Sequence, residues 1–126
     1  MRHLFLISMI LLTGCVSKFS QTNYDRIVDI VVNTRDVDVI CASHDVLADT
    51  ITTVHKDTVY ALEDSIGRND TDIITMINTQ MDEIDRFDKM LKNGSISPVY
   101  CKQKIQNINA TARIIAREEG NKLNLQ

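Results

Sequence analysis

The sequence predicts an all-α fold, a small antiparallel helical bundle or hairpin of about three helices. Three observations lead to this prediction. Residues 36–66 contain neither Gly nor Pro, and their apolar residues recur every three or four positions, as on one face of a helix. Residues 71–92 show the same period, and Ser97-Pro98 is a typical helix start. The 126 residues, 25% charged and 44% apolar, correspond to one domain.

The segment at residues 24–34 is ambiguous between helix and strand. Tyr24, Ile27, Val28 and Val31 fit one helical face, while the density of β-branched residues also suits a strand. No second strand-like segment follows that could pair with it, so a helix is favoured. The preceding residues are polar and unpatterned, and we expect a tether there. The domain then covers residues 24–120, followed by a flexible tail at 121–126.

Residues 36–66 are expected to form a single long helix. Its apolar seam is narrow, close to the a/d pattern of a coiled coil, and such a seam can serve a partner helix as readily as the protein's own core. The seam residues are Ile40, His44, Leu47, Ile51, Val54, Thr58 and Ala61, with Leu62 and Ile66 extending it. His44 is interpreted as a polar residue that sets the register of a helix interface. Gly67 should follow the helix at C′, and Asn69 or Asp70 should cap the next one.

Two more helices are expected, at residues 71–92 and about 98–118. The face of the first is Ile73, Ile77, Met81, Ile84 and Leu91, widened by Ile74 and Phe87. Asp82–Arg86, Asp85–Lys89 and Asp88–Lys92 are acid-before-base pairs with i,i+4 spacing, each worth ~0.2–0.5 kcal/mol. The face of the last helix is Cys101, Ile105, Ile108, Ala112 and Ile115, and Gly120 should close it.

The N-terminal residues form a pattern of their own. Met1-Arg2-His3 is a short basic start, and residues 4–12 are an unbroken apolar run, too short to span a ~30 Å hydrocarbon core. The run ends in Leu12-Thr13-Gly14-Cys15. This segment resembles the lipobox of bacterial lipoproteins. The resemblance implies a signal peptide at residues 1–14, a thioether-linked diacylglycerol on Cys15, cleavage before that residue and N-acylation of the new terminus.

The same resemblance implies a location. Lipoproteins with Asp directly after the lipidated Cys tend to stay in the inner membrane, whereas this chain has Val16 there. The implied location is the inner leaflet of the outer membrane, facing the periplasm, with residues 15–23 as lipidated Cys and tether. Each acyl chain contributes ~0.8 kcal/mol per buried CH₂, so an anchor with several chains is effectively permanent.

The cysteine count supports a disulfide. Of the three cysteines, a lipid on Cys15 leaves Cys41 and Cys101, an even pair in an oxidising compartment. In an up-down-up arrangement both lie near the N-terminal ends of parallel helices and could meet. A bridge closing this loop would contribute roughly 4 kcal/mol on the loop-entropy model. An interchain bridge that makes a covalent dimer and two free buried thiols are the alternatives.

The sequence shows no pattern typical of a catalytic, cofactor or metal site. His44 and His55 are three helical turns apart, ~16 Å, too far to share one metal. The acidic run Asp82, Glu83, Asp85 and Asp88 is interpreted as a solvated face of ion pairs. No CxxC, HExxH, GxSxG or P-loop occurs, and a net charge of −3 provides no basic footprint for nucleic acid. We therefore expect neither an enzyme nor a cofactor.

Two non-enzymatic functions follow as hypotheses. The first is a membrane-anchored lipoprotein whose helices bind a partner protein in the periplasm or inner membrane, or a second copy of the chain. The second rests on a resemblance: a lipobox before a short helical domain is similar to the outer-membrane spanins of phages, which help to fuse the two membranes during host lysis. The chain departs from that family in having only one Pro, Pro98. Exclusion lipoproteins, which block superinfection or plasmid entry, are similar in the same general way.

Overall fold

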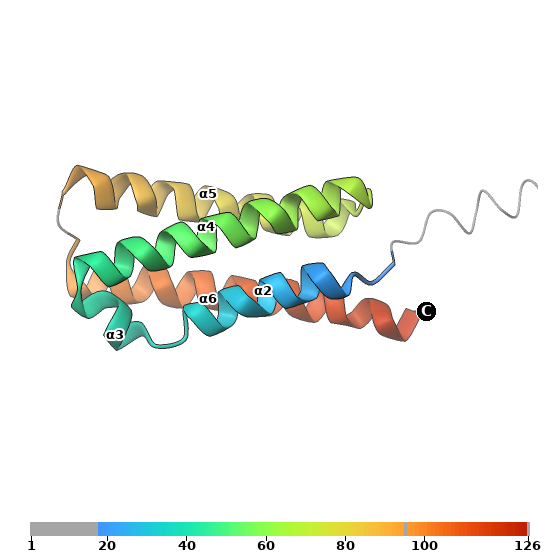
Figure 1. Cartoon of the computed structure of the whole chain (residues 1–126), viewed down its shortest axis with the longest axis horizontal. Helices are drawn as coiled ribbons and strands as arrows, with labels where there is room; N and C mark the ends of the chain where they lie inside the picture. Colours follow the sequence, from blue (N-terminus) through green and yellow to red (C-terminus); the bar gives the residue numbers. More distant parts are fainter. Residues whose placement is uncertain (1–17, 95, 126) are drawn as a thin grey trace, which may run out of the picture.

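In the computed structural model, which describes residues 18–94 and 96–125, the chain folds into an antiparallel four-helix bundle (Figure 1). The bundle helices are α2 (Gln21–Asn33), α4 (His44–Gly67), α5 (Thr71–Asn93) and α6 (Pro98–Asn121). The short helix α3 (Val37–Ala42) packs against α4 and α6, and a 3₁₀ turn, η1 (Lys122–Leu125), follows α6. The all-α class is confirmed, with more helices than the three expected.

Each bundle helix packs against two neighbours. Both α2 and α5 contact α4 and α6, so the four helices form a ring around one core. Ser20, just before α2, lies beside Asp64 near the end of α4 and Glu119 near the end of α6, so α2 runs antiparallel to both. We call the end of the bundle that contains these three residues the tether end, and the opposite end, which contains Cys41 and Cys101, the disulfide end.

Side-chain caps begin each helix from α2 to α6. The capping residues are Ser20, Asp36, Ser43, Asp70 and Ser97, each accepting a hydrogen bond from a backbone N–H in the first turn. The expected Ser97-Pro98 start and the Asp70 cap are thus confirmed. The left-handed residue after α4 is Asn69 (φ 55°), whereas Gly67 remains in the helix. Asn tolerates this conformation because its short polar side chain can bond locally.

The long helix expected over residues 36–66 is broken at Ser43. The Ser43 backbone is extended (φ −135°, ψ 131°), and its hydroxyl accepts a hydrogen bond from the Val46 N–H at 3.4 Å. A serine side chain that accepts a backbone hydrogen bond can thus end one helix and begin the next without any Gly or Pro. Because α4 begins at His44, this residue is exposed, and the prediction that it sits in a helix interface is wrong. Ile66, expected to extend the seam, is exposed as well.

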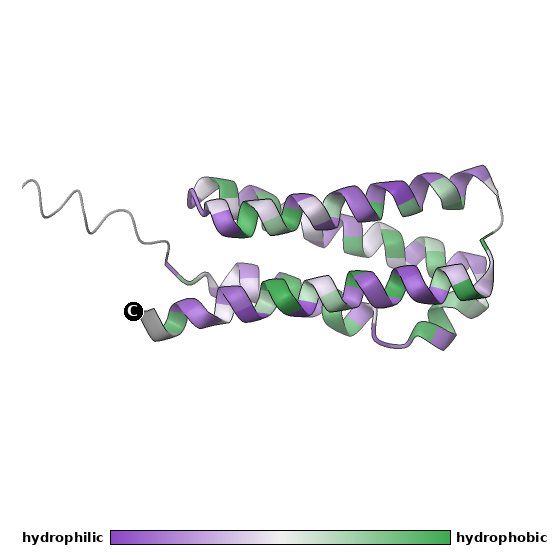
Figure 2. Cartoon of the chain, turned by 180° about the vertical axis from the view of Figure 1, so that it is seen from behind, coloured by the Kyte–Doolittle hydropathy of each residue, from purple (hydrophilic) through white to green (hydrophobic). Residues whose placement is uncertain are grey.

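The core confirms most of the predicted apolar faces. The buried seam residues of α3 and α4 are Ile40, Leu47, Ile51, Val54, Thr58 and Ala61, and the predicted face of α6 is buried throughout. The seam therefore packs inside the chain's own bundle. In α2 the buried face is rotated from the expected one, because Ile27 and Ile30 are buried while Tyr24, Val28 and Val31 are only half-buried. Figure 2 shows polar and apolar segments alternating along the helices.

Two polar side chains, the buried Gln80 and the half-buried Asn109, add specific contacts between the helices. Gln80 of α5 donates from Nε2 to the Ile108 carbonyl of α6 at 2.9 Å. Asn109 of α6 donates from Nδ2 to the Val31 carbonyl of α2 at 2.9 Å. A buried polar group without a partner is costly, so these bonds favour one register of each helix pair over its alternatives.

The two ends of the chain differ from the expected boundaries. Helix α2 begins at Gln21, inside the segment expected as tether, and α6 continues through Gly120 into the segment expected as flexible tail. The signal peptide, with Leu12, Thr13 and Gly14, and the lipidation residue Cys15 lie outside the described residues. None of the described helices combines the length and the apolar character that crossing a membrane requires.

Candidate interaction surface

A groove of about 490 Å³ runs along the surface between α2 and α6. Its floor is largely apolar and its rim is basic. The apolar lining residues are Tyr24, Val28, Val31 and Ala116, and the basic ones are Arg35, Arg113 and Arg117. Gly120 and Asn121 complete the groove towards the tether end.

Helix periodicity and antiparallel pairing place the three arginines on one groove. Arg113 and Arg117 are one turn apart on α6, so their side chains are neighbours on the helix surface. Arg35 follows α2, and the contacts of Asn109 with Val31 and Thr34 bring this end of α2 against α6. From Tyr24 to Arg35 the groove extends roughly 16 Å, at ~1.5 Å per residue.

The guanidinium groups of this groove lack acidic partners among residues 18–94 and 96–125. Within the described residues, Arg35, Arg113 and Arg117 form no ion pair with a carboxylate. Arg113 donates from Nε to the neutral Asn109 Oδ1 at 2.8 Å, and all three side chains are exposed. An acidic chain of net charge −3 thus presents a locally positive surface over an apolar floor.

A buried ionic cluster lies at the tether end. Glu119 is 0% exposed, and its carboxylate lies 3.2 Å from Arg68 Nη1 and accepts a hydrogen bond from the Ser20 N–H at 2.9 Å. Arg68 also donates from Nε to Asp64 Oδ1 at 2.9 Å. Its Nη1 also lies 3.6 Å from Asp70 Oδ2. The guanidinium thus compensates three carboxylates, of which that of Glu119 is fully withdrawn from water.

Lys122 is the second cation of this cluster. Burial, and then the positive charge of Arg68, lower the pKa of Lys122 to about 8. Its ammonium contacts the Asp70 carboxylate and lies 3.7 Å from Glu119 Oε2. Near pH 7 the group is therefore still mostly protonated and adds to the compensation of the buried carboxylates.

The cluster is the polar feature that the sequence patterns missed. Glu119 lies four residues after Ile115 and therefore continues the buried face of α6. A Glu at the end of an apolar stripe is ordinarily expected to turn to solvent. Its position on the stripe was the available signal, but its cation, Arg68, is 51 residues away in the sequence, and only the fold brings the two together.

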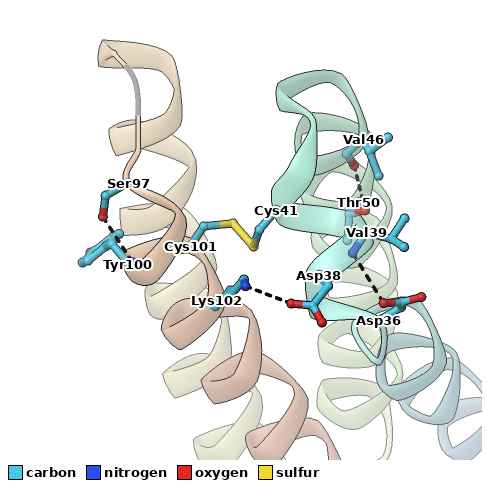
Figure 3. The surroundings of a disulfide bond; sticks show 10 residues. All are labelled: Asp36, Asp38, Val39, Cys41, Val46, Thr50, Ser97, Tyr100, Cys101 and Lys102. Carbon is cyan, nitrogen blue, oxygen red and sulfur yellow. Dashed lines mark hydrogen bonds and ion pairs between the residues drawn. A yellow bond between two sulfur atoms is a disulfide. The ribbon is translucent and has the colours of Figure 1, made fainter.

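The predicted disulfide lies at the other end of the bundle (Figure 3). Cys41 of α3 and Cys101 of α6 are joined within the chain, with their Cα atoms 5.9 Å apart and a sequence separation of 60. The bridge is therefore the intrachain one that the cysteine count favoured, and neither an interchain bridge nor a pair of free thiols. Beside it, Lys102 Nζ lies 2.9 Å from Asp38 Oδ1, a second contact between α6 and α3.

The remaining sequence-predicted residues do not converge on one site. His44 is exposed at the start of α4, and His55 Nε2 lies 3.3 Å from Asp85 Oδ1. Of the three i,i+4 ion pairs expected in α5, only Asp88–Lys92, at 2.8 Å, forms among the described residues. In that part of the chain, no group of three or more His, Cys, Asp or Glu side chains could hold a metal ion.

Glu83 and Asp82 complete the acidic run of α5. Glu83 pairs with Lys104 of α6 at 3.1 Å, so the one carboxylate without a cation four residues on finds its partner on the neighbouring helix. Asp82 is exposed. The run therefore contributes two contacts between helices, Glu83 with Lys104 of α6 and Asp85 with His55 of α4. Such partly exposed single ion pairs are worth about 0–1 kcal/mol each.

A carboxyl group between α2 and α4 provides a test of the electrostatics. Burial, and then the charge of Asp29, raise the pKa of Asp57 above 3.8. Because the pKa is higher in the folded state, the contribution of Asp57 to stability is lost as pH rises through that pKa, and the ionised group destabilises the fold near neutral pH. We expect Asp57→Asn to raise the free energy of unfolding by about 0.5 kcal/mol near pH 7 and to give no gain below about pH 4.

Urea unfolding followed by circular dichroism at the two pH values checks this expectation. Asp49→Asn, an exposed aspartate on the same helix, is the matched control and should change neither value. An equal gain at both pH values for Asp57→Asn would contradict the assignment to charge.

The fold and this surface define an all-α, disulfide-linked four-helix bundle with one basic groove. Compared with protein-family models, curated proteins and solved structures, the chain matches none of them significantly.

Proposed function

We propose that the protein is a lipoprotein anchored through Cys15 in the inner leaflet of the outer membrane, and that its helical domain acts non-enzymatically by binding a partner protein. The observation that carries the binding proposal is the groove between α2 and α6. Its apolar floor is surrounded by three arginines that pair with no carboxylate in the described part of the chain. Arg and Tyr are enriched among the residues that dominate interface energetics, and this groove contains both.

The chemistry of the groove favours an acidic amphipathic helix as the partner. Such a helix places its apolar face in a groove through residues at i, i+3, i+4 and i+7. Acidic residues one turn apart on its flank would face Arg113 and Arg117, which are themselves one turn apart on α6. Complementary charge of this kind speeds association and selects against basic partners. The apolar seam of α4 is not available for this role, because the chain's own core buries it.

The lipobox supports the anchor, and Cys15→Ser tests it. Serine lacks the thiol that accepts the diacylglycerol, so we expect the variant to incorporate no labelled palmitate and to move from the membrane fraction to the soluble fraction. Ser17→Ala leaves the lipobox intact and should behave as the wild type. Unchanged labelling and fractionation of Cys15→Ser would refute the lipid anchor.

The groove is tested by photo-crosslinking in cells. A photo-reactive amino acid at Val28, on the groove floor, should form an adduct with a partner protein, and one at the exposed Val99 of the disulfide end should not. Replacing Arg113 and Arg117 together by Glu should lower the adduct yield about tenfold or more, because two interface anchors are lost. Arg86→Glu/Lys89→Glu, at two exposed residues of α5, is the charge-matched control.

Two results would contradict the groove proposal. An adduct whose yield is the same with and without the two arginines would place the contact elsewhere. Adducts formed only with lipid or with a second copy of the chain would replace the acidic partner helix by those occupants.

A further inference from the structure

The tether end of the bundle holds the first described residues of the chain against the helices. The Lys18 carbonyl accepts a hydrogen bond from Arg68 Nη1 at 2.9 Å, and the Ser20 N–H donates to Glu119 Oε1 at 2.9 Å. The Ser20 hydroxyl donates to Asp64 Oδ2 at 2.9 Å. These three bonds hold residues 18–20 against the ends of α4 and α6. Detaching this segment would break its hydrogen bonds to the buried ionic cluster.

This clamp limits how far the bundle can stand from a lipid on Cys15. Three residue steps separate Cys15 from Lys18, and a fully extended chain spans at most about 3.6 Å per residue. The segment between Cys15 and Lys18 can therefore span no more than about 11 Å. A 24-residue helix such as α6 is ~36 Å long. The tether end must lie close to the headgroups, and the disulfide end is free to stand away from them.

The surface at this end suits contact with a bilayer. Ile66 in the last turn of α4 and Leu123 after α6 are 58% and 54% exposed, although both are large and apolar. Lys18, the first described residue, is exposed at the same end of the bundle, where its carbonyl meets Arg68. The carboxylates of Asp64 and Glu119 are compensated by Arg68, which reduces their repulsion of anionic headgroups.

We infer that the tether end is a membrane-contact surface, on which Ile66 and Leu123 enter the headgroup region of the bilayer. The short segment between Cys15 and Lys18 holds this end at the membrane, and the bundle points away from it. The occupant is the phospholipid surface of the leaflet that holds the anchor, and the inference rests on the proposed lipidation of Cys15. Apolar residues with a neighbouring Lys are typical of protein surfaces that lie at this boundary.

Tryptophan fluorescence tests this contact without background, since the chain contains no Trp. Ile66→Trp and Leu123→Trp place the reporter at the tether end, and Val99→Trp, at a side chain 78% exposed, is the matched control at the disulfide end. Each full-length variant is purified in its processed, lipidated form and reconstituted into vesicles of phosphatidylethanolamine and phosphatidylglycerol. The lipid on Cys15 is verified by mass spectrometry of the same sample.

We expect the emission of the two tether-end variants to shift to shorter wavelength on reconstitution and to lose intensity with brominated acyl chains. The Val99→Trp emission should stay that of a residue in water. Absence of both effects at positions 66 and 123 in a verified lipoprotein would overturn the inference, as would equal effects at all three positions, which would mean that the bundle lies flat. A protein mass that shows no acyl chains on Cys15 would instead refute the proposed lipid anchor. The inferred membrane contact, which rests on that anchor, would be refuted as well.

Discussion

Removal of the Cys41–Cys101 bridge should lower the free energy of unfolding by about 4 kcal/mol. The bridge closes a loop with a sequence separation of 60, and the entropy that it removes from the unfolded chain grows with the logarithm of that length. A loss of this size is close to the whole stability of many small domains. We expect Cys41→Ala/Cys101→Ala to unfold at much lower urea concentration, measured by circular dichroism.

Two controls separate the bridge from the side chains that form it. The wild-type protein in reductant should unfold near the midpoint of the double variant, because both lack the cross-link and the variant loses only the two sulfur atoms in addition. Cys101→Ala alone should match the double variant, since one partner is enough to abolish the bond. A reduced wild type as stable as the oxidised one would show that the cross-link does not contribute.

Arg68→Met should destabilise the fold by about 3 kcal/mol, because it leaves the fully buried Glu119 without its main cation. The substitution keeps a long apolar side chain, so the loss reports charge compensation more than packing. It also removes the hydrogen bond to the Lys18 carbonyl. Urea unfolding near neutral pH measures the effect.

The double variant Arg68→Met/Glu119→Met makes this prediction specific. Removing the stranded carboxylate as well should restore part of the lost stability, so that the double variant is more stable than Arg68→Met alone. Lys102→Met, which breaks the exposed pair with Asp38, should cost less than 1 kcal/mol. A double variant no more stable than Arg68→Met would contradict the idea that Glu119 depends on this guanidinium.

The α-helical elements could be read from the chain because their signals are local. Residues 71–92 and 98–118 carry apolar faces with a regular period, and Ser97-Pro98 begins a helix through chemistry contained in two adjacent residues. The disulfide could be predicted from the cysteine count, because a lipid on Cys15 leaves Cys41 and Cys101 as the one remaining pair. The helix expected to carry Cys41 was wrong, because this residue lies near the end of the short α3.

The errors arose where a local pattern permits more than one outcome. Ser43 is compatible with a helix interior, but in the structure it caps α4 while α3 packs against α6. His44 shared the spacing of the seam, but the break at Ser43 turns it to solvent. In α2 the apolar residues extend around more than one face, so the position of its neighbours selects Ile27 and Ile30 for the core.

The sequence by itself determined the helical class and the periods of the buried faces, because helix signals and binary pattern are short-range. The anchor at Cys15 stays a prediction from an equally short-range pattern, the lipobox. The tertiary structure alone decided the basic groove and the buried cluster. Arg35 and Arg113 reach one groove, and Arg68 reaches Glu119, only after helices distant in sequence pack antiparallel. Charge compensation depends on distance in space, and a linear pattern does not contain that distance until the fold is known.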